Sequence, residues 1–443
     1  MMIHSTTPKY RAALDIIGRL RKSGYEALFA GGAVRDMLMG GADDGDIDIA
    51  TNARPEIVAR LFSHTIPVGV KFGVIIVVMG GVPFEVATFR SDTGSEDGRH
   101  PESVVFTDAR TDALRRDFTI NGLFYDPLTG EVNDYVNGRA DISGRIIRAI
   151  GDPSLRFKED YLRLLRAVRF AARFDFSIDG ATWNAIVEHA PAIVHISVER
   201  IFAELDKMLR GPHADRALDL LYESGLLGLV LPEVAALKGV EQPPEFHPEG
   251  DVFEHTKKAL SLLEPDPSST LVWSLLLHDI GKPGTMVKAD RLRFNNHDQV
   301  GMHLARRLLK EFHTSNTLID DTADCIANHM NFMNVKRMRL GTLKRLLSRP
   351  TIETEMELHR LDCLASHGNC ENYEFIKEQL AVFKTESLKP QPLLGGRDLI
   401  AFGFKPGPLF GEILDRLYDL QLEETIQTRE EAIAFVREHY RPS

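Results

Sequence analysis

The sequence changes character near residue 151, and this change limits the folds that are open to the chain. Between residues 25 and 134, β-rich runs such as DIDIAT, VIIVVM and PFEVATFR alternate with short helical patterns, which is typical of a small sheet domain with helices. After residue 151 the pattern is helical, with breaks at segments such as EQPPEFHPEG and KPQPLLGG. A chain of 443 residues is too long for a single hydrophobic core, so we expect several domains. The two patterns predict an α+β N-terminal domain followed by all-α domains.

The composition indicates a globular protein of the cytoplasm. Cys325, Cys363 and Cys370 show no CxxC spacing, which favours reduced thiols. No apolar run of about 18 residues is present and the N-terminus lacks the core of a secretory signal, so we expect no membrane partner. The net charge of −11 argues weakly against nucleic acid, but residues 139–173 contain nine basic and four acidic side chains. This segment either binds a polyanion or forms a solvated helix face with internal ion pairs.

The stretch GGAVRDMLMGGADDGDIDIATN (31–52) combines two features of phosphate chemistry. Gly31 and Gly32 lie between a strand pattern and a helix pattern, where backbone N–H groups favour phosphate oxygens, and Arg35 follows one turn later. Asp46 and Asp48 alternate with isoleucines, so both carboxylates are expected on one face of a strand. Such a pair favours a divalent cation, and the combination predicts metal-assisted phosphoryl or nucleotidyl transfer.

Residues 158–174 (KEDYLRLLRAVRFAARF) have the pattern of one amphipathic helix. The apolar residues share one side, which packs, and the other side carries Asp160, Arg163, Arg166, Arg169 and Arg173. A carboxylate beside a guanidinium offers acceptors and donors that can read the edge of a nucleobase. The alternative is an internal ion pair between Asp160 and Arg163 with no ligand.

These motifs, together with DARTDALRRDFTINGLFYDP (108–127), resemble the class II tRNA nucleotidyltransferases, the family of CCA-adding enzymes and bacterial poly(A) polymerases. The resemblance covers residues 25–210. It implies a polymerase-beta-like catalytic head with a small mixed sheet, followed by a helical neck, body and tail. The implied activity is template-independent addition of CMP and AMP from CTP and ATP to the 3′ end of tRNA, with Mg²⁺ in the head and no DNA partner.

The resemblance also assigns residues to this reaction. Asp46 and Asp48 would hold Mg²⁺, and Glu85 is a candidate third carboxylate on a neighbouring strand. Nucleotide contacts are implied for Gly31, Gly32, Arg35, Arg116, Asp160, Arg163, Arg166 and Arg169. Within this set, Asp160 and Arg163 would form hydrogen bonds with the base edges of CTP and ATP.

The same motif residues serve several activities, so the specificity stays open. The chain could add only CC, only the final A, or a poly(A) tail. Two other classes are a phosphohydrolase whose head merely binds nucleotide, and an RNA-binding protein with an inactive site. The polar, glycine-containing loop at residues 91–104 is expected to move during nucleotide switching.

A second set of motifs, including FEHT, LLLHDIGKP and IANHM, resembles an HD domain, a helical metal-dependent phosphohydrolase. Mixed imidazole and carboxylate ligands favour divalent transition metals. The resemblance implies a first metal site of His255, His278, Asp279 and Asp362, with His297 and His329 completing a second. The metal would support either hydrolysis of a phosphoester or only the fold of the domain.

We therefore expect four domains. They are a nucleotidyltransferase head (1–150), a neck that binds nucleotide and RNA (151–245), an HD domain (246–370) and a helical tail (371–443). The tail is expected mainly to be a packing module, and the resemblance adds contact with the tRNA elbow. The oligomeric state is not predicted.

Overall fold

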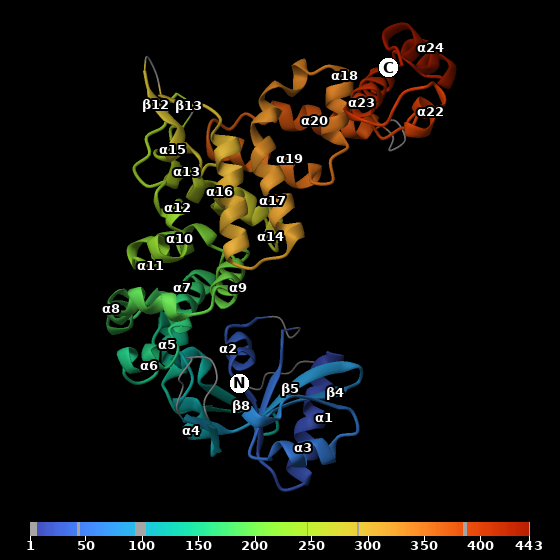
Figure 1. Ribbon diagram of the computed structural model, residues 1–443. Coiled ribbons are helices and arrows are strands. Elements are labelled where there is room, and N and C mark those ends of the chain that lie inside the picture. The colour runs from blue at the N-terminus through green and yellow to red at the C-terminus, as the bar shows by residue number, and fades with distance from the viewer. Residues whose placement is uncertain are drawn as a thin grey trace. The chain divides into compact units, whose positions relative to one another are not determined.

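The computed structural model describes residues 7–41, 45–93, 103–245, 247–289, 292–383 and 388–442. The chain forms two compact units, Met1–Pro232 and Glu233–Ser443, each with its own core (Figure 1). The first unit contains the predicted sheet domain and the helices that follow it. The finer division at residues 150, 245 and 370 stays a prediction.

A seven-stranded mixed sheet forms the first part of the first unit. Its strands, in spatial order, are β3 (Thr65–Gly69), β4 (Val74–Met79), β5 (Val82–Thr88), β2 (Asp48–Thr51), β1 (Ala27–Ala30), β8 (Leu123–Asp126) and β9 (Glu131–Asp134). Strands β2 and β5 are parallel, and the other neighbouring pairs are antiparallel. The predicted β-rich runs are therefore confirmed, and the parallel pair places the ends of two central strands side by side.

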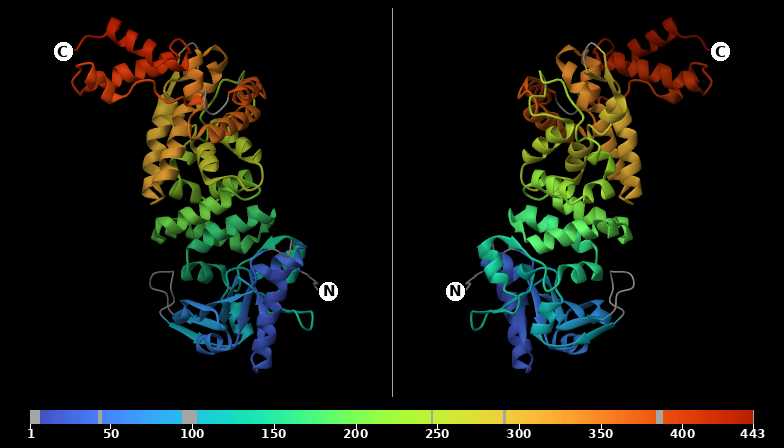
Figure 2. Two further views of the ribbon diagram at one scale, coloured as in Figure 1. Left: turned by 90° about the vertical axis from the view of Figure 1, so that its right-hand side faces the viewer. Right: turned by 90° about the vertical axis from the view of Figure 1, so that its left-hand side faces the viewer.

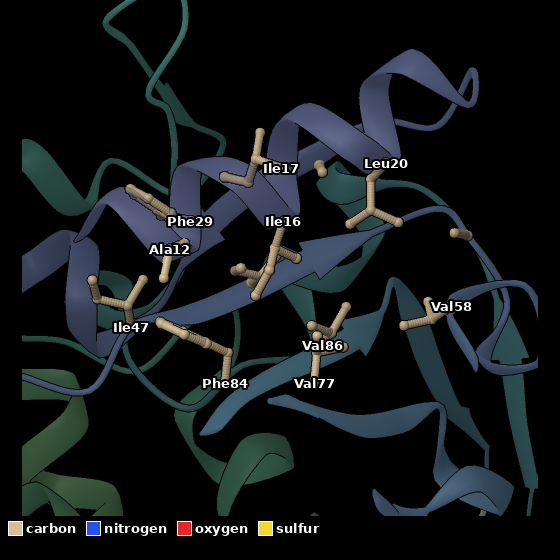
Figure 3. Close-up of a cluster of buried hydrophobic side chains, with 14 of the residues drawn as sticks. Ala12, Ile16, Ile17, Leu20, Phe29, Ile47, Val58, Val77, Phe84 and Val86 are labelled. Carbon is tan, nitrogen blue, oxygen red and sulfur yellow. The ribbon is translucent and has the colours of Figure 1, made fainter. Parts of the chain in front are cut away.

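Helix α1 (Pro8–Lys22) covers one face of this sheet (Figure 3). Thr7 begins the helix because its side chain accepts a hydrogen bond from the Tyr10 amide at 3.2 Å, and a proline follows at the first helical position. The face that packs on the sheet presents Ala12, Ile16, Ile17 and Leu20 to Phe29, Ile47, Val77, Phe84 and Val86. Burying each large apolar side chain contributes about 1.5–3 kcal/mol, so this layer holds the central strands in place.

The opposite face of the central strands packs against short helical and irregular segments of the same unit. Leu28 and Ala30 of β1 pack there with Phe89, Phe124 and α4 (Ala109–Leu114). Helix α2 (Gly32–Leu38) begins directly after β1, and α3 (Pro55–Leu61) follows β2. The strands β6 (Arg90–Thr93) and β7 (Ser103–Phe106) pair antiparallel, and the 3-10 helix η1 (Val70–Phe72), which follows β3 in the chain, contacts β7 and β4. Most of the loop predicted to move, residues 94–102, lies outside the described residues.

The rest of the first unit is helical. Its helices are α5 (Gly138–Gly144), α6 (Pro153–Glu159), α7 (Leu162–Phe174), α8 (Gly180–His189), α9 (Val198–Leu209), α10 (Ala214–Glu223) and α11 (Leu226–Val230), with 3-10 helices η2 (Thr119–Asn121) and η3 (Ala190–His195). Two short strands, β10 (Ile146–Ile147) and β11 (Ser177–Ile178), pair in parallel. The expectation that no strand follows residue 151 is wrong here, because a two-residue strand is too short to give a sequence pattern.

The single helix predicted over residues 158–174 is also wrong, because the structure has two helices with a break at Asp160. Asp160 is extended, with φ −159° and ψ 104°, and its side chain accepts a hydrogen bond from the Leu162 amide at 3.1 Å. An aspartate that bonds to the backbone in this way competes with helix formation. The apolar side of α7 is as predicted, with Leu164, Leu165 and Val168 buried.

The second unit consists mainly of helices (Figures 1 and 2). They are α12 (Pro232–Ala235), α13 (Val252–Ser261), α14 (Ser269–Leu277), α15 (Lys282–Thr285), α16 (His297–Glu311), α17 (Asn316–Asn328), η4 (His329–Arg337), α18 (Leu340–Leu347), α19 (Ile352–Ala365), α20 (Glu371–Val382), α22 (Gly396–Ala401), α23 (Pro408–Leu422) and α24 (Arg429–His439). A hairpin of β12 (Met286–Lys288) and β13 (Leu292–Phe294) is a second exception to the predicted all-α pattern.

The last three helices of this unit, red in Figure 2, share a small core that includes Leu399, Ile413 and Val436. Helix α23 contacts α18, where Lys344 pairs with Glu424 at 2.8 Å. Among the described residues, no helix of either unit is long and apolar enough to span a bilayer.

Candidate active sites

A cavity of about 720 Å³ in the first unit brings together all the site residues predicted for the head and the neck. These are Gly31, Gly32, Arg35, Asp46, Asp48, Glu85, Arg116, Asp160, Arg163, Arg166 and Arg169. The lining residues include ten basic and five acidic side chains. This excess of positive charge favours a polyanionic ligand such as a nucleoside triphosphate.

Three of the five acidic side chains that line the cavity, Asp46, Asp48 and Glu85, are the predicted metal ligands. Ile49 pairs with Val86 across the parallel strands β2 and β5, so Asp48 and Glu85 are level with each other. Ile49 and Val86 belong to the core on the α1 side, and the alternation along a strand therefore points both carboxylates toward the cavity. Glu85 thus lies where the sequence predicted a third carboxylate, on the strand next to Asp48.

Asp48 is under electrostatic strain in this arrangement. Burial, followed by the charges of Glu85 and Asp46, raises its pKa to about 6. Asp46 precedes the strand, which begins at Asp48, and its side chain is fully exposed with Lys9 Nζ at 3.5 Å. The prediction that both aspartates belong to one strand is therefore wrong by two residues. Carboxylate oxygens are the ligands that a hard divalent cation prefers, and its charge would relieve their repulsion, but oxygen atoms from all three residues do not lie within 4.8 Å of one another in this structure.

The glycine pair sits where the backbone passes close to an arginine. Gly31 has φ 63°, and a Cβ atom on it would lie 2.6 Å from Nη1 of Arg116. Only glycine combines this left-handed conformation with such a close approach. Arg116 itself is held by Asp112, whose Oδ2 accepts from Nε and Nη2 at 3.1 and 3.0 Å. The guanidinium is thereby fixed at the wall of the cavity beside the start of α2.

Arg35 makes more hydrogen bonds within the protein than the sequence indicated. Its Nε donates to Asp36 at 2.8 Å, its Nη1 donates to Asn121 at 2.5 Å, and its guanidinium lies 4.6 Å from the ring of Phe174. Burial lowers its pKa despite the charge of Asp36. These contacts tie α2 to α7, and a contact between Arg35 and nucleotide stays a prediction.

The arginines of α7 are each held by a carboxylate from elsewhere in the first unit. Arg166 donates to Asp117 Oδ2 from Nε at 2.8 Å and from Nη2 at 2.5 Å. Burial opposes ionisation of Asp117, but Arg166 and the neighbouring hydrogen bonds lower its pKa to about 2. Arg169 donates to Glu204 Oε2 at 2.6 Å. The guanidinium groups are therefore oriented before any ligand arrives.

Asp160 and Arg163 lie in the same cavity but do not form the internal ion pair considered from the sequence. Nη1 of Arg163 donates to Glu159 Oε2 at 2.5 Å and to the Arg156 carbonyl at 2.8 Å. Asp160 Oδ2 instead accepts from Nη2 of Arg200 at 2.7 Å. Both side chains keep further hydrogen-bonding capacity toward the cavity.

Several lining residues were not predicted as site residues. Arg200 and Lys207 come from α9, and Asn121 comes from the 3-10 helix η2. Arg200, Glu204 and Lys207 are spaced by four and three residues, so they share one side of α9. This spacing was visible in the sequence, but nothing in it indicated that the charged side of α9 meets α7.

The six predicted ligands of the HD region also converge, in the second unit. His255, His278, Asp279, His297 and His329 are buried. Nε2 of His255 lies 3.0 Å from Asp362, Nε2 of His278 lies 3.2 Å from Asp279, and Nε2 of His297 lies 3.2 Å from Nε2 of His329. Asp279 belongs both to a group with His255 and His278 and to a group with His297 and His329, so it lies between the two predicted sites.

The histidine rings are oriented as metal ligands usually are. Nδ1 of His278, His297 and His329 lies 2.6–2.8 Å from backbone carbonyl oxygens, and Nδ1 of His255 lies 2.6 Å from Glu249. In a neutral ring these partners place the proton on Nδ1 and direct the Nε2 lone pair at the centre. Burial opposes protonation of His255, but its hydrogen bonds with Asp362 and Glu249 raise its pKa to about 9, so a metal would have to displace a proton from this ring. Burial, then the charge of His278, lowers the pKa of His329 to about 4, which keeps that imidazole neutral.

Three buried atoms at this centre, Nε2 of His255, Nε2 of His278 and Oδ2 of Asp279, have no partner with hydrogen-bond geometry among the described residues, although polar groups of other residues lie 2.7–3.2 Å from them. Unsatisfied imidazole and carboxylate atoms facing one another fit a divalent transition metal. Burial opposes ionisation of Asp279, but His278 and Lys282 lower its pKa well below the ordinary value. Glu249 and Lys282, whose Nζ lies 2.7 Å from Asp279, were not predicted from the sequence.

Comparison with known families agrees with this arrangement of sites. The family model for the poly A polymerase head domain matches residues 27–148, and the model for the probable RNA and SrmB-binding site of polymerase A matches residues 175–238. The HD domain model matches residues 252–366. The predicted polymerase-beta-like head, followed by mostly helical regions that include an HD domain, is confirmed.

Individual relatives extend these matches. The CCA-adding enzyme of Geobacillus stearothermophilus is 49% identical over 220 residues, which are 49% of this chain and 54% of that protein, so the chain spans about half the length of that relative. The CCA-adding enzyme of Anoxybacillus flavithermus is 31% identical over 426 residues, which cover 96% of both proteins.

Among solved structures, the Bacillus stearothermophilus CCA-adding enzyme, crystallised in complex with CTP, is similar with a TM-score of 0.76 and 30% identity over 98% of both chains. Similarity at this level over nearly the whole length shows that the chain belongs to the family of CCA-adding enzymes.

Proposed function

We propose that this chain adds nucleotides from CTP and ATP to the 3′ end of tRNA without a nucleic acid template, and so builds or repairs the CCA end. One observation carries the proposal: a single cavity holds the carboxylates Asp48 and Glu85 together with the base-reading candidates Asp160 and Arg163. The full-length similarity to CCA-adding enzymes and the match to an RNA-binding family model support it. We place the reaction in the cytoplasm, where tRNA and both nucleotides occur.

The carboxylates would serve the bond-forming step. The 3′ hydroxyl oxygen of the RNA attacks the α-phosphorus, a new phosphodiester bond forms, and pyrophosphate leaves. Asp46, Asp48 and Glu85 offer the oxygen ligands that Mg²⁺ prefers. When bound there, Mg²⁺ supplies a more acidic attacking hydroxyl and neutralises negative charge at the phosphate. Arg116, which is held by Asp112 and lines the cavity, would bind the triphosphate near the start of α2.

Asp160 and Arg163 would replace a template. An ionised carboxylate only accepts hydrogen bonds, and a guanidinium only donates them. Cytosine and adenine both present an exocyclic amino group, which can donate a hydrogen bond to Asp160. Both also present a ring nitrogen, which can accept a hydrogen bond from Arg163. Uracil and guanine present a carbonyl oxygen where the amino group stands, so one pair of protein groups separates the two classes of base. An unpaired group costs about 1–3 kcal/mol.

The proposal is tested by incubating the purified protein with Mg²⁺, one labelled nucleotide at a time and three RNAs. These are tRNA without CCA, tRNA ending in CC, and an unstructured RNA. We expect CMP on the first RNA and AMP on the second. Addition of only CC, of only the final A, or of a long A tail to the unstructured RNA would identify the corresponding narrower activity. No incorporation would overturn the proposal.

A second activity is favoured by the unsatisfied atoms of the HD centre. We propose that His255, His278, Asp279 and Asp362, with His297 and His329, hold a divalent transition metal and that this centre hydrolyses phosphoesters. When bound, the metal supplies an acidic water near neutral pH. The buried Lys282, which donates to Gln242 at 2.6 Å and pairs with Asp279, would add positive charge beside a bound phosphate group. Assays on 2′,3′-cyclic nucleotides with nickel, cobalt or manganese test this, and no turnover with any of them would reduce the centre to a structural role.

A further inference from the structure

We propose that Gln242 is a substrate-binding residue of the HD centre, where it donates a hydrogen bond to an oxygen of the phosphate group that binds beside the metal. The inference rests on the phosphoester hydrolysis proposed above and names a residue that binds its substrate. Gln242 lies between the matched segments, because the RNA-binding model ends at residue 238 and the HD domain model begins at residue 252. The loop between them, described except for residue 246, adds side chains to the HD centre from outside the matched HD domain.

The loop at residues 240–252 is closed at its base. The Val252 amide donates to the Val240 carbonyl at 3.1 Å, and the Gly239 amide donates to Asp251 Oδ2 at 2.7 Å. Its two ends are thereby held together, as in the compact surface loops called Ω-loops. A side chain on this loop therefore keeps a defined position relative to helix α13, which begins at the closing residue.

Two side chains of the loop reach the predicted metal ligands. Glu249 Oε1 lies 2.6 Å from Nδ1 of His255. On the other side of the loop, Gln242 Oε1 accepts a hydrogen bond from Nζ of Lys282 at 2.6 Å. The same Nζ lies 2.7 Å from Oδ2 of Asp279. The amide of Gln242 is therefore separated from a predicted metal ligand by a single ammonium group.

The Gln242 amide has donors that no described group of the protein uses. An ammonium group only donates, so Oε1 is the amide atom that faces Lys282, and Nε2 points elsewhere. Gln242 is only 5% exposed, and its Nε2 is buried with no hydrogen-bond partner among the described residues. A buried donor without a partner is unfavourable, so its retention indicates a ligand that accepts a hydrogen bond there.

The surroundings of this donor favour an anion as that ligand. Lys282 is buried and carries its positive charge between Gln242 and Asp279. A metal at the HD centre would add positive charge on the same side. A phosphate oxygen accepts hydrogen bonds and is negatively charged, so it uses both the amide donor and the charge, whereas a water molecule or a neutral ligand uses only the donor.

The test measures binding of inorganic phosphate to the full chain loaded with Co²⁺, whose visible absorption changes when a ligand binds at the metal. An Asp48→Asn background restricts Co²⁺ to the HD centre. Gln242→Glu keeps an oxygen for Lys282 but replaces the donor by an acceptor, and Gln242→Met removes the donor without adding a charge. Each change should weaken phosphate binding at least tenfold, the effect of losing one hydrogen bond to a charged group.

Glu241→Gln is the matched control. Glu241 is the neighbouring residue of the same loop, its side chain is 68% exposed, and it pairs with Lys288 at the surface. This variant should bind phosphate as tightly as the unaltered loop does. The Co²⁺ content of every variant, measured by mass spectrometry, should stay unchanged, because Gln242 is not a predicted metal ligand.

Three results would overturn the inference. They are undiminished phosphate affinity in Gln242→Met, an absorption spectrum that phosphate does not alter in the unaltered loop, and loss of Co²⁺ from both Gln242 variants, which would make Gln242 a structural support of the centre. Failure of the proposed hydrolysis is a distinct result. In that case the wild-type protein would bind phosphate at the metal but would hydrolyse no 2′,3′-cyclic nucleotide, and the binding role of Gln242 would stand.

Discussion

Asp48 is a residue whose negative charge destabilises the fold although the proposed function requires it. Its pKa of about 6 in the folded protein exceeds the value of about 3.9 for an aspartate in an unfolded chain. Between these pH values the folded protein therefore binds a proton that the unfolded chain has lost. Ionised Asp48 then lowers the free energy of unfolding increasingly as the pH rises toward 6, and fully above it.

Replacing this charge should stabilise the protein while removing its activity. For Asp48→Asn in the presence of EDTA, we expect the free energy of unfolding at pH 7.5 to increase by on the order of 1–2 kcal/mol, because burial and the repulsion by Glu85 no longer act on a charge. Near pH 4 the gain should vanish. Urea denaturation at both pH values measures the effect.

Asp46→Asn is the control for this experiment, because the Asp46 side chain is fully exposed and its charge contributes less to the raised pKa of Asp48 than burial and Glu85 do, so it should shift the unfolding curve much less than Asp48→Asn. Both variants should lose nucleotide incorporation. A destabilised Asp48→Asn protein at pH 7.5 would contradict the electrostatic account of the site.

The same carboxylates predict the pH dependence of metal binding. A proton on Asp48 competes with the cation, so the affinity for Mn²⁺, used as a paramagnetic substitute for Mg²⁺, should fall as the pH decreases through about 6. Electron paramagnetic resonance titrations at pH 7.5 and pH 5.5 measure free Mn²⁺ directly. To exclude ions bound at the HD centre, the titration uses a His278→Ala and Asp279→Ala background. Equal affinity at the two pH values would contradict the assignment of Asp48 as a ligand.

Gly31 provides a steric test at the residue scale. Gly31→Ala would place a Cβ atom 2.6 Å from Arg116 in a backbone conformation that alanine rarely adopts, so Arg116 must shift. We expect the KM for CTP to rise about tenfold, as for strain of roughly 1–3 kcal/mol. Gly18→Ala in α1 is the matched control, because a Cβ there meets no atom within 4 Å and should raise stability by about 0.5–1 kcal/mol. An unchanged KM in Gly31→Ala would contradict the role of the close approach.

At the scale of elements, the break between α6 and α7 is the feature that makes Asp160 available. The residue ends one helix and begins the next through its own side chain, so its carboxylate is not part of a continuous helical surface. Asp160→Asn keeps the size of the side chain but adds a donor where Asp160 offers only acceptors. We expect UTP and GTP incorporation to rise relative to CTP and ATP, measured as ratios of kcat/KM. Unaltered ratios would show that Asp160 does not read the base.

Local patterns in the sequence predicted the helices and strands well. Contacts between segments that are distant in the sequence were predicted poorly. Periodicity 2 and the apolar stripe of α7 were enough for the strands and for the buried Leu164 and Val168. The break at Asp160 was missed because a side-chain bond to the backbone overrode an uninterrupted helical pattern. The partners Arg200 and Glu249 were missed for a different reason, since their roles depend on which surfaces pack together.

The motifs predicted the site more completely than physical reasoning from single residues did. All eleven residues predicted for the nucleotide-addition site line one cavity, although their individual contacts differ from the simple expectation. Arg35 looked free to bind phosphate but is bonded to Asp36 and Asn121. A sequence specifies which chemical groups are available, whereas the fold decides how many of their hydrogen bonds remain for a ligand.

At the scale of the whole molecule, the two candidate centres lie in different compact units. The double variant His278→Ala and Asp279→Ala should therefore lose transition-metal content and phosphoesterase activity while nucleotide addition persists. Mass spectrometry of bound metals and assays of both activities on the full chain measure these effects. The Asp48→Asn variant is the reciprocal control and should keep the metal of the HD centre. Unchanged metal content in the double variant would contradict the assignment of its ligands.

The most direct test of the central claim uses tRNA that lacks the whole CCA end, all four nucleoside triphosphates at equal concentration, Mg²⁺ and no other nucleic acid. The products are sequenced at their 3′ ends. The account predicts that most extended molecules end in CCA and that growth stops there, because Asp160 and Arg163 select C and A without a template. Extended ends rich in U or G, or no extension by the wild-type protein, would contradict it.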